Sequence, residues 1–195
     1  IYKGKRRKYV EQVQLSSDEW REIAEYAGEI DMPFISTPGD FESVDLLDDI
    51  GVKAYKIASM DINNLRFLSH IAKKAKPMFV STGMSTIGEI DRAIETIHAE
   101  GNNEIVLLHC TSIYPTPVEL ANLYMMGTLR NTFALPTGYS DHSIGTDIPV
   151  AATALGACMI EKHMTLDKSI EGQEHFMCAD PDDLALLVQK VTDSV

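Results

Sequence analysis

The sequence lacks an apolar run long enough to cross a membrane, which requires about 20 consecutive apolar residues. It also lacks a recognisable signal peptide, because the opening stretch IYKGKRRKYV (1–10) is basic but has no apolar core. These two absences predict a protein that has no membrane partner.

Cysteine is scarce, and its pattern excludes a disulfide-based fold. Cys110, Cys158 and Cys178 are odd in number, and no pair has the CxxC spacing. A disulfide framework is therefore not expected, and the reducing environment of the cytoplasm fits this cysteine usage.

Positive charge is also in short supply. There are 17 Lys and Arg residues against 29 Asp and Glu residues, which gives a formal net charge of −12. This balance argues against nucleic acid as a partner, because phosphate backbones are bound by an excess of Lys and Arg. It still allows a small anionic ligand, which needs only a local positive pocket.

Short apolar runs alternate with amphipathic segments along the chain. The length and β-branched content of these runs are typical of strands buried on both faces. The expected strands are residues 32–37, 54–59, 77–83, 104–110, 135–142 and 158–165. Strands that alternate with helices predict right-handed βαβ units and therefore a parallel sheet.

Three of the expected helices have clear start signals. A glutamate follows Ser16 and Thr86 at the third place, which is the capping-box spacing, and Asp180-Pro181 is a typical first turn. The helix after Thr86 ends before Gly101 and has an apolar stripe of Ile87, Ile90, Ile94 and Ile97. These segments supply the helical half of the βαβ pattern.

Two observations favour a barrel over a doubly wound sheet. No G-x-G-x-x-G follows the first run, and polar residues gather after all six runs rather than at one switch point. The expected fold is an α/β (β/α)₈ TIM-type barrel truncated to about six βα units, strands 3–8, with residues 1–195 as one partial barrel domain. The missing strands are expected before the first run, and the open edges would need a partner or an absent segment.

Two successive expected strands each end on a histidine. Residues two apart in a strand share a face, so Ser140 and His142 line one face of their strand, and Glu161 and His163 line one face of the next. Two neutral imidazoles at the mouth of a barrel suit a divalent metal such as Mn, Fe, Co or Zn. The alternative is that each histidine is an ordinary core or loop residue.

Lys56 lies in the middle of an apolar strand, where an ammonium group needs an anionic partner. Either it pairs with an acidic neighbour such as Glu161, or it contacts the phosphate or carboxylate of a ligand. Hydroxyl groups around one mouth would favour a phosphorylated small molecule, although each alone is a typical turn or cap residue. These hydroxyls belong to Thr37, Ser59, Ser81, Thr82, Thr111, Ser112 and Ser140.

His109 and Cys110 are adjacent in the sequence, which raises the question of a cysteine nucleophile with a histidine base. Adjacent residues of a strand point to opposite faces, so the two side chains cannot pair directly. A Cys–His nucleophile is therefore not expected here.

Five ordered motifs closely resemble the sialic acid synthase family, whose members include N-acetylneuraminate, legionaminate, pseudaminate and spore-coat polysaccharide synthases. The motifs are YKIAS (55–59), STGM (81–84), LLHCTSIYPTP (107–117), GYSDHS (138–143) and IEKHMTLD (160–167). The resemblance implies a (β/α)₈ barrel that condenses phosphoenolpyruvate with an N-acetylated hexose, similar to N-acetylmannosamine. The products are a nine-carbon 2-keto-3-deoxy sugar acid and phosphate.

The resemblance also implies roles for single residues, matched motif to motif. His142 and His163 match the metal ligands of the family, usually for Mn²⁺, with Mg²⁺ or Co²⁺ as alternatives. Tyr114 matches a sugar-side position, and Ser112 stands where an asparagine of some members contacts phosphoenolpyruvate. The positions that match phosphoenolpyruvate contacts are Thr37, Lys56, Ser59, Ser81 and Ser140.

The chain departs from the family pattern in three respects. The catalytic glutamate and further substrate contacts of the family lie on its first two strands and the loops after them. No residue of this chain is assigned the role of that glutamate. The C-terminal antifreeze-like domain, which reaches across a homodimer in the family, is not in this sequence; a homodimer is expected by resemblance alone. GQE (172–174) replaces the usual GPD, so Glu174 would take the sugar-binding role of that aspartate, and its extra methylene leaves the sugar open.

The isolated chain is therefore expected to be inactive as a synthase and to work as part of a longer enzyme. One alternative is a non-catalytic barrel fragment that keeps a metal or phosphate site. The other is a metal-dependent aldolase or hydrolase on the same fold, which would turn over without phosphoenolpyruvate.

Overall fold

The computed structural model describes residues 14–171 and 174–194. The basic opening stretch and the Gly172-Gln173 part of the GQE motif lie outside these ranges. Among the described residues, no helix combines the length and the apolar character that a membrane crossing requires.

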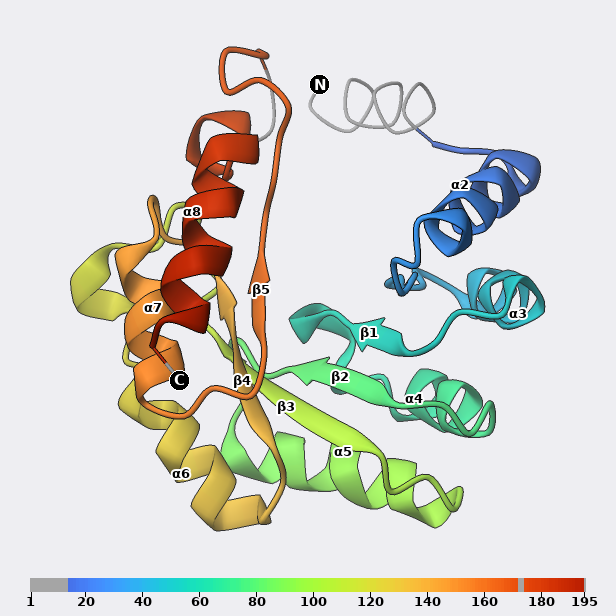
Figure 1. Cartoon of the computed structure of the whole chain (residues 1–195). Coiled ribbons are helices and arrows are strands. Elements are labelled where there is room, and N and C mark those ends of the chain that lie inside the picture. Colours follow the sequence, from blue (N-terminus) through green and yellow to red (C-terminus); the bar gives the residue numbers. More distant parts are fainter. Residues whose placement is uncertain (1–13, 172–173, 195) are drawn as a thin grey trace, which may run out of the picture.

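The sheet is parallel throughout, and its five strands lie side by side in chain order. Figure 1 shows the strands in the middle of the molecule, with the helices around the outer side of the curved sheet. The fold is therefore α/β with a parallel sheet, as the alternating pattern predicts, and the five strands form a half-barrel. The strands are β1 (Tyr55–Ile57), β2 (Met78–Ser81), β3 (Ile105–Cys110), β4 (Thr137–Asp141) and β5 (Ile160–Lys162).

The expected strand at residues 32–37 is wrong in extent. It contributes only an isolated parallel bridge between Ser36 and Tyr55, with the Lys56 amide donating to the Ser36 carbonyl at 3.0 Å. Met32 and Ile35 are exposed, so this run does not have the two buried faces that its composition suggests. The segment still lies beside β1, in the place that the expected strand would take.

The helices begin where the sequence places their caps. Ser16 and Thr86 each form a complete capping box, with Glu19 and Glu89 respectively, and Asp180 caps the last helix. Gly101 follows the helix that Thr86 opens and has a φ of +82°, a conformation that glycine adopts without strain. The helices are α2 (Ser17–Glu29), α3 (Phe41–Ile50), α4 (Leu65–Ala72), α5 (Ile87–Ala99), α6 (Tyr124–Phe133), α7 (Asp147–Ala154) and α8 (Pro181–Thr192).

The main apolar core fills the space between the sheet and its outer helices. Ile90, Ile94 and Ile97 of α5 are buried in it, as the stripe predicts, while Ile87 at the start of the stripe is 41% exposed. A smaller cluster packs α6 and α7 against β4 around Tyr139. Packing on the outer face leaves the other face of the sheet free for polar side chains, which is where the site lies.

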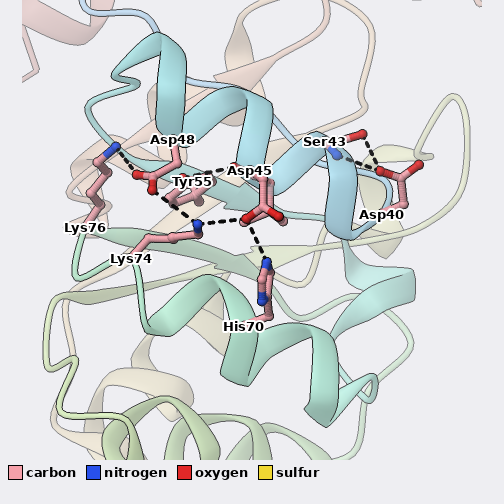
Figure 2. A network of polar contacts seen from close by, with 9 residues as sticks. Asp40, Ser43, Asp45, Asp48, Tyr55, His70, Lys74 and Lys76 are labelled. Atoms are coloured by element: carbon pink, nitrogen blue, oxygen red, sulfur yellow. Dashed lines mark hydrogen bonds and ion pairs between the residues drawn. The ribbon is translucent and has the colours of Figure 1, made fainter.

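Charged residues join α3 to α4 and to the loop before β2, as Figure 2 shows. The Lys74 ammonium lies 2.8 Å from Asp45 Oδ1 and 3.2 Å from Asp48 Oδ2. His70 also contacts Asp45, and Lys76 lies 2.7 Å from Asp48 Oδ1. The hydrogen bond from Lys74 lowers the pKa of Asp45, and the one from Lys76 is the main cause that lowers the pKa of Asp48.

We expect Lys74→Met to lower the thermal midpoint at neutral pH by about 2–4 °C, a shift typical of a modest loss in a domain of this size. Both aspartate pKa values are lower in the folded state than the ordinary 3.8, so the stabilisation is complete above pH 3.8. It disappears as the pH falls through the folded values, where the carboxylates become protonated. Calorimetric scans at pH 7 and in acid should therefore show the difference from wild type narrowing below pH 3.8.

Lys53→Met is the matched control, because Lys53 is exposed and has no ion pair among the described residues. An equal fall of the midpoint in both variants would show that the network in Figure 2 contributes nothing to stability.

Candidate functional site

A cavity of about 420 Å³ opens at the carboxyl ends of the strands. All five strands, or the residues directly after them, contribute to its wall, together with Thr37 beside the bridging segment. Nine of the ten site residues expected from the sequence line it: Thr37, Lys56, Ser59, Ser81, Ser112, Tyr114, Ser140, His142 and His163. Residues from six separate segments therefore meet in one place, as the barrel interpretation requires.

An ion pair spans the cavity between the first and last strands of the sheet. Lys56 of β1 lies with its ammonium nitrogen 3.4 Å from Oε2 of Glu161 in β5. This contact confirms that Lys56 pairs with an acidic neighbour. The lysine also lines the cavity, so the ion pair lies where a ligand would contact it. Among the described residues, the buried Oε2 of Glu161 makes no hydrogen bond beyond this ion pair, and Lys56 donates one, to the carbonyl of Ile57 at 3.2 Å. Both charges are incompletely satisfied, as expected for groups that contact a ligand.

Small hydroxyl side chains gather at one side of the cavity around Gly83. Ser59 accepts a hydrogen bond from the Gly83 amide at 3.0 Å and lies 3.2 Å from the sulfur of Cys110. The hydroxyl of Ser112 lies 3.9 Å from the same sulfur. The hydroxyl of Ser81 is buried and has no partner among the described residues. Hydroxyls with free hydrogen-bonding capacity in a cavity that also contains Lys56 suit a small anion.

The two histidines approach each other at the other side of the cavity. Their ring centroids are 5.4 Å apart, and the ring of Tyr114 lies 4.0 Å from His142 and 5.9 Å from His163. His142 Nδ1 lies 2.9 Å from the Thr111 carbonyl, which can only accept, so Nδ1 carries the proton. Burial lowers the pKa of His142, although this hydrogen bond opposes the effect. The ring is therefore neutral near pH 7, with the lone pair of Nε2 available to a metal.

Tyr114 remains a hydrogen-bond donor over the whole physiological pH range. Burial raises its pKa to about 12, with smaller contributions from Cys110, Glu174 and Glu161. Glu174 does not line the cavity. It directly follows the two undescribed residues and precedes a short 3₁₀ turn, His175–Met177. Its charge acts on Tyr114, although its side chain is not part of the cavity wall.

Other polar residues near the strand ends have structural roles. His109 points away from the cavity, and its Nε2 lies 2.9 Å from the Ala121 carbonyl, whereas Cys110 lines the cavity. The two side chains therefore lie on opposite faces, and the expected absence of a Cys–His pair is confirmed. The hydroxyls of Thr82 and Thr111 donate to backbone carbonyls and do not line the cavity.

The two imidazoles are of a kind that suits a divalent metal. Within residues 14–171 and 174–194, no group of three or more His, Cys, Asp or Glu side chains is arranged to hold a metal ion. Any metal held by His142 and His163 would take its other ligands from water, from a substrate or from residues outside these ranges.

The family model described as "NeuB family" matches residues 2–195, nearly the whole chain. The chain belongs to the NeuB family. This result confirms the resemblance drawn from the five sequence motifs.

Individual members of the NeuB family match nearly the whole length of this chain. An uncharacterized protein of Methanocaldococcus jannaschii is 47% identical over 92% of this chain and 53% of its own length. The N,N'-diacetyllegionaminic acid synthase of Campylobacter jejuni is 43% identical over 93% of this chain and 55% of its own. The crystal structure of an N-acetylneuraminic acid synthetase from Leptospira borgpetersenii superimposes with a TM-score of 0.89 and 35% identity, covering 93% of this chain and 63% of that one. The chain thus spans about half the length of the curated relatives that it matches.

Three features of the site could not be identified from the motifs alone. Gly83 and Cys110 stand inside the STGM and HCTS motifs, but only the fold shows that Gly83 lies against Ser59, Cys110 and Ser112. The lack of a hydrogen bond to Glu161 Oε2 among the described residues depends on side-chain placement. Asp141 and Lys162, adjacent to the two histidines, form a buried ion pair on the far side of the sheet. The alternation of the strands predicts that these side chains face away from the cavity, but not that they pair.

We expect Gly83→Ala to weaken binding of phosphoenolpyruvate, the ligand that the family resemblance predicts. A Cβ atom on Gly83 would lie 2.4 Å from Ser112 Oγ, 2.8 Å from Cys110 Sγ and 2.9 Å from Ser59 Oγ, so these side chains must rotate away. Two displaced hydroxyls, at about 0.5–1.5 kcal/mol each, correspond to binding that is roughly 5- to 150-fold weaker. Isothermal titration calorimetry measures this change.

Gly88→Ala serves as the control, because a Cβ atom at this position in α5 meets nothing within 4 Å. If Gly83→Ala folds and binds phosphoenolpyruvate as tightly as Gly88→Ala does, the serine cluster around Gly83 is not part of the anion site.

Proposed function

We propose that this chain is the barrel portion of an enzyme that condenses phosphoenolpyruvate with an N-acetylated hexose. The products are a nine-carbon 2-keto-3-deoxy sugar acid and inorganic phosphate. The observation that carries the proposal is the meeting of nine residues, from six segments, in one cavity with one ammonium, several hydroxyls and two imidazoles. Membership of the NeuB family, with relatives named as legionaminic and N-acetylneuraminic acid synthases, supports it.

The anionic substrate is held by the side of the cavity that contains Lys56. Its ammonium group supplies the positive charge that a phosphate or carboxylate needs, and Ser59, Ser81 and Ser112 supply hydrogen-bond donors. Thr37 and Ser140 line the same cavity and complete the proposed contacts. These groups fix phosphoenolpyruvate in one orientation, so much of the rate enhancement comes from positioning its C3 carbon.

A divalent metal, Mn²⁺ in the first place and Mg²⁺ or Co²⁺ as alternatives, is assigned to His142 and His163. The donor set fits such an ion, because His142 presents a neutral imidazole whose proton is fixed on Nδ1 by the Thr111 carbonyl. When bound, the metal supplies Lewis acidity to the aldehyde oxygen of the open-chain sugar. Tyr114 and Glu174 are assigned to the sugar, with Tyr114 as a permanent hydrogen-bond donor.

The chemistry forms one carbon–carbon bond and breaks one bond to phosphate. C3 of phosphoenolpyruvate attacks the aldehyde carbon, and the aldehyde oxygen takes up a proton. Water adds at C2 and loses a proton, and the resulting tetrahedral centre expels inorganic phosphate to leave the 2-keto group. Throughout, Lys56 and the hydroxyls stabilise the negative charge of the phosphate and carboxylate groups.

The catalytic glutamate of the family is assigned to the first two barrel strands and the loops after them. The full eight-stranded barrel, the homodimer and the lack of synthase activity in the isolated chain belong to the same proposal. A cytoplasmic setting also belongs to it, and the free thiols of Cys110, Cys158 and Cys178 are consistent with such a reducing environment.

The function is tested by adding the missing barrel strands from a relative and supplying phosphoenolpyruvate, Mn²⁺ and N-acetylmannosamine or related hexoses. We expect phosphate release matched by formation of a 2-keto acid, and loss of both in His142→Ala and in His163→Ala. A Mn²⁺ titration of the 195-residue chain should show binding that each histidine variant loses.

The alternatives give different results in the same assay. Mn²⁺ binding without any turnover in the extended protein would indicate a non-catalytic barrel. Metal-dependent turnover without phosphoenolpyruvate would indicate an aldolase or hydrolase.

Lys56→Met tests the anion side separately. We expect phosphoenolpyruvate to bind about 10- to 100-fold more weakly, because a charge-assisted hydrogen bond contributes about 1.5–3 kcal/mol. Lys53→Met, which removes an exposed lysine outside the cavity wall, should bind like wild type. Wild-type affinity in Lys56→Met would mean that this lysine only pairs with Glu161.

A further inference from the structure

A second ion pair lies behind the two histidines, on the face of the sheet that is turned away from the cavity. Lys162 Nζ is 2.5 Å from Asp141 Oδ2, and the two side chains are 5% and 0% exposed. The two residues stand directly opposite each other in the register of β4 and β5. The pair is therefore a direct side-chain connection between the two strands that precede His142 and His163.

Hydrogen bonds to Ser143 complete this arrangement. Asp141 Oδ1 accepts from the amide of Ser143 at 2.9 Å and from its hydroxyl at 2.7 Å, and Lys162 also donates to the Ser143 carbonyl at 2.8 Å. The chain thus folds back around His142, which lies between the two bonded residues. We call Asp141, Ser143 and Lys162 the β4–β5 clamp.

The clamp and the histidines are coupled by the alternation of the strands. Asp141 and Lys162 point outward, so their neighbours His142 and His163 point into the cavity. The β5 strand has only three residues, and β4 is the one strand it pairs with among the described residues. A shift of β5 along or away from β4 would therefore carry His163 with it. Each histidine also has a backbone contact outside the pair: His142 with Thr111 and Thr116, and His163 with Ala179, whose amide donates to the His163 carbonyl at 2.9 Å.

A buried ion pair is weak evidence for stability, because apolar residues of similar volume often serve as well. A buried ion pair does restrict geometry, because the carboxylate and the ammonium must lie within hydrogen-bonding distance in one arrangement. On these grounds we propose that Asp141 and Lys162 are positioning residues that set the spacing of the His142 and His163 imidazoles for one metal ion. The proposal deepens the proposed function and rests on its assignment of these histidines.

The test removes the charges without leaving one of them buried alone. Asp141→Asn combined with Lys162→Met keeps an oxygen for the Ser143 amide but removes the ionic link between the strands. We expect Mn²⁺, measured by electron paramagnetic resonance of the free ion, to bind about tenfold or more weakly, in the range found when groups that orient metal ligands are lost. Lys74→Met, which removes ion pairs between α3 and α4, should leave the Mn²⁺ affinity unchanged.

A second readout needs no metal. In the metal-free chain, nuclear magnetic resonance of the His142, His163 and Tyr114 rings should show altered ring-to-ring contacts in the double variant and wild-type contacts in Lys74→Met. Unchanged contacts with unchanged Mn²⁺ affinity in a folded double variant would overturn the proposal. If wild type itself binds no Mn²⁺, the metal assignment fails, and the ring contacts alone decide whether the clamp positions the histidines.

Lys162→Arg covers the case in which the double variant does not fold. It keeps the charge but places a longer, planar group between the strands, so the proposal again predicts altered ring contacts and weaker Mn²⁺ binding. Wild-type behaviour of a folded Lys162→Arg variant in both readouts would show that the pair has no positioning role.

Discussion

The alternation of side chains along β4 and β5 is the constraint on which the site depends. In a parallel strand, successive residues point to opposite faces, so a motif such as SDH or EKH must send its charges to both sides of the sheet. Ser140, His142, Glu161 and His163 line the cavity, while Asp141 and Lys162 meet on the helix side. A shift of one residue in either strand would bury the imidazoles and expose the ion pair to the cavity.

The curvature of the sheet supplies the second condition. β1 and β5 are the first and last strands in the sheet order, yet Lys56 and Glu161 approach to 3.4 Å across the cavity. A flat sheet would separate strands so far apart in the order by several strand spacings of about 4.8 Å each. The contact between the two ends of the sheet is thus a consequence of the half-barrel, and it places the lysine where ligand and carboxylate compete for it.

The predictable part of the molecule is the part set by local chemistry and by strand period. The capping boxes at Ser16 and Thr86 and the five strands follow from residue types a few positions apart, and the common face of Ser140 and His142 follows from a period of two. The strand predicted at 32–37 is wrong in extent, because an apolar composition indicates only that a segment tends to join a sheet. The length of the strand depends on the neighbours that it meets elsewhere in the fold. The crowding around Gly83 and the Asp141–Lys162 pair join segments about 20 to 50 residues apart, and pairing across that distance is decided by register and packing.

The charges of the cavity connect the proposed anion site with the proposed metal site. Lys56 and Glu161 contribute opposite charges, and His142 is kept neutral by burial, so these groups give almost no net positive charge. A phosphate group carries about −1.5 to −2 at pH 7, and phosphoenolpyruvate adds a carboxylate. In a protein with a formal charge of −12, one partly neutralised lysine does not balance such a ligand. A divalent cation on the two histidines would offset most of this negative charge within the same cavity, so the electrostatics favour the proposed metal and anion binding as one coupled event.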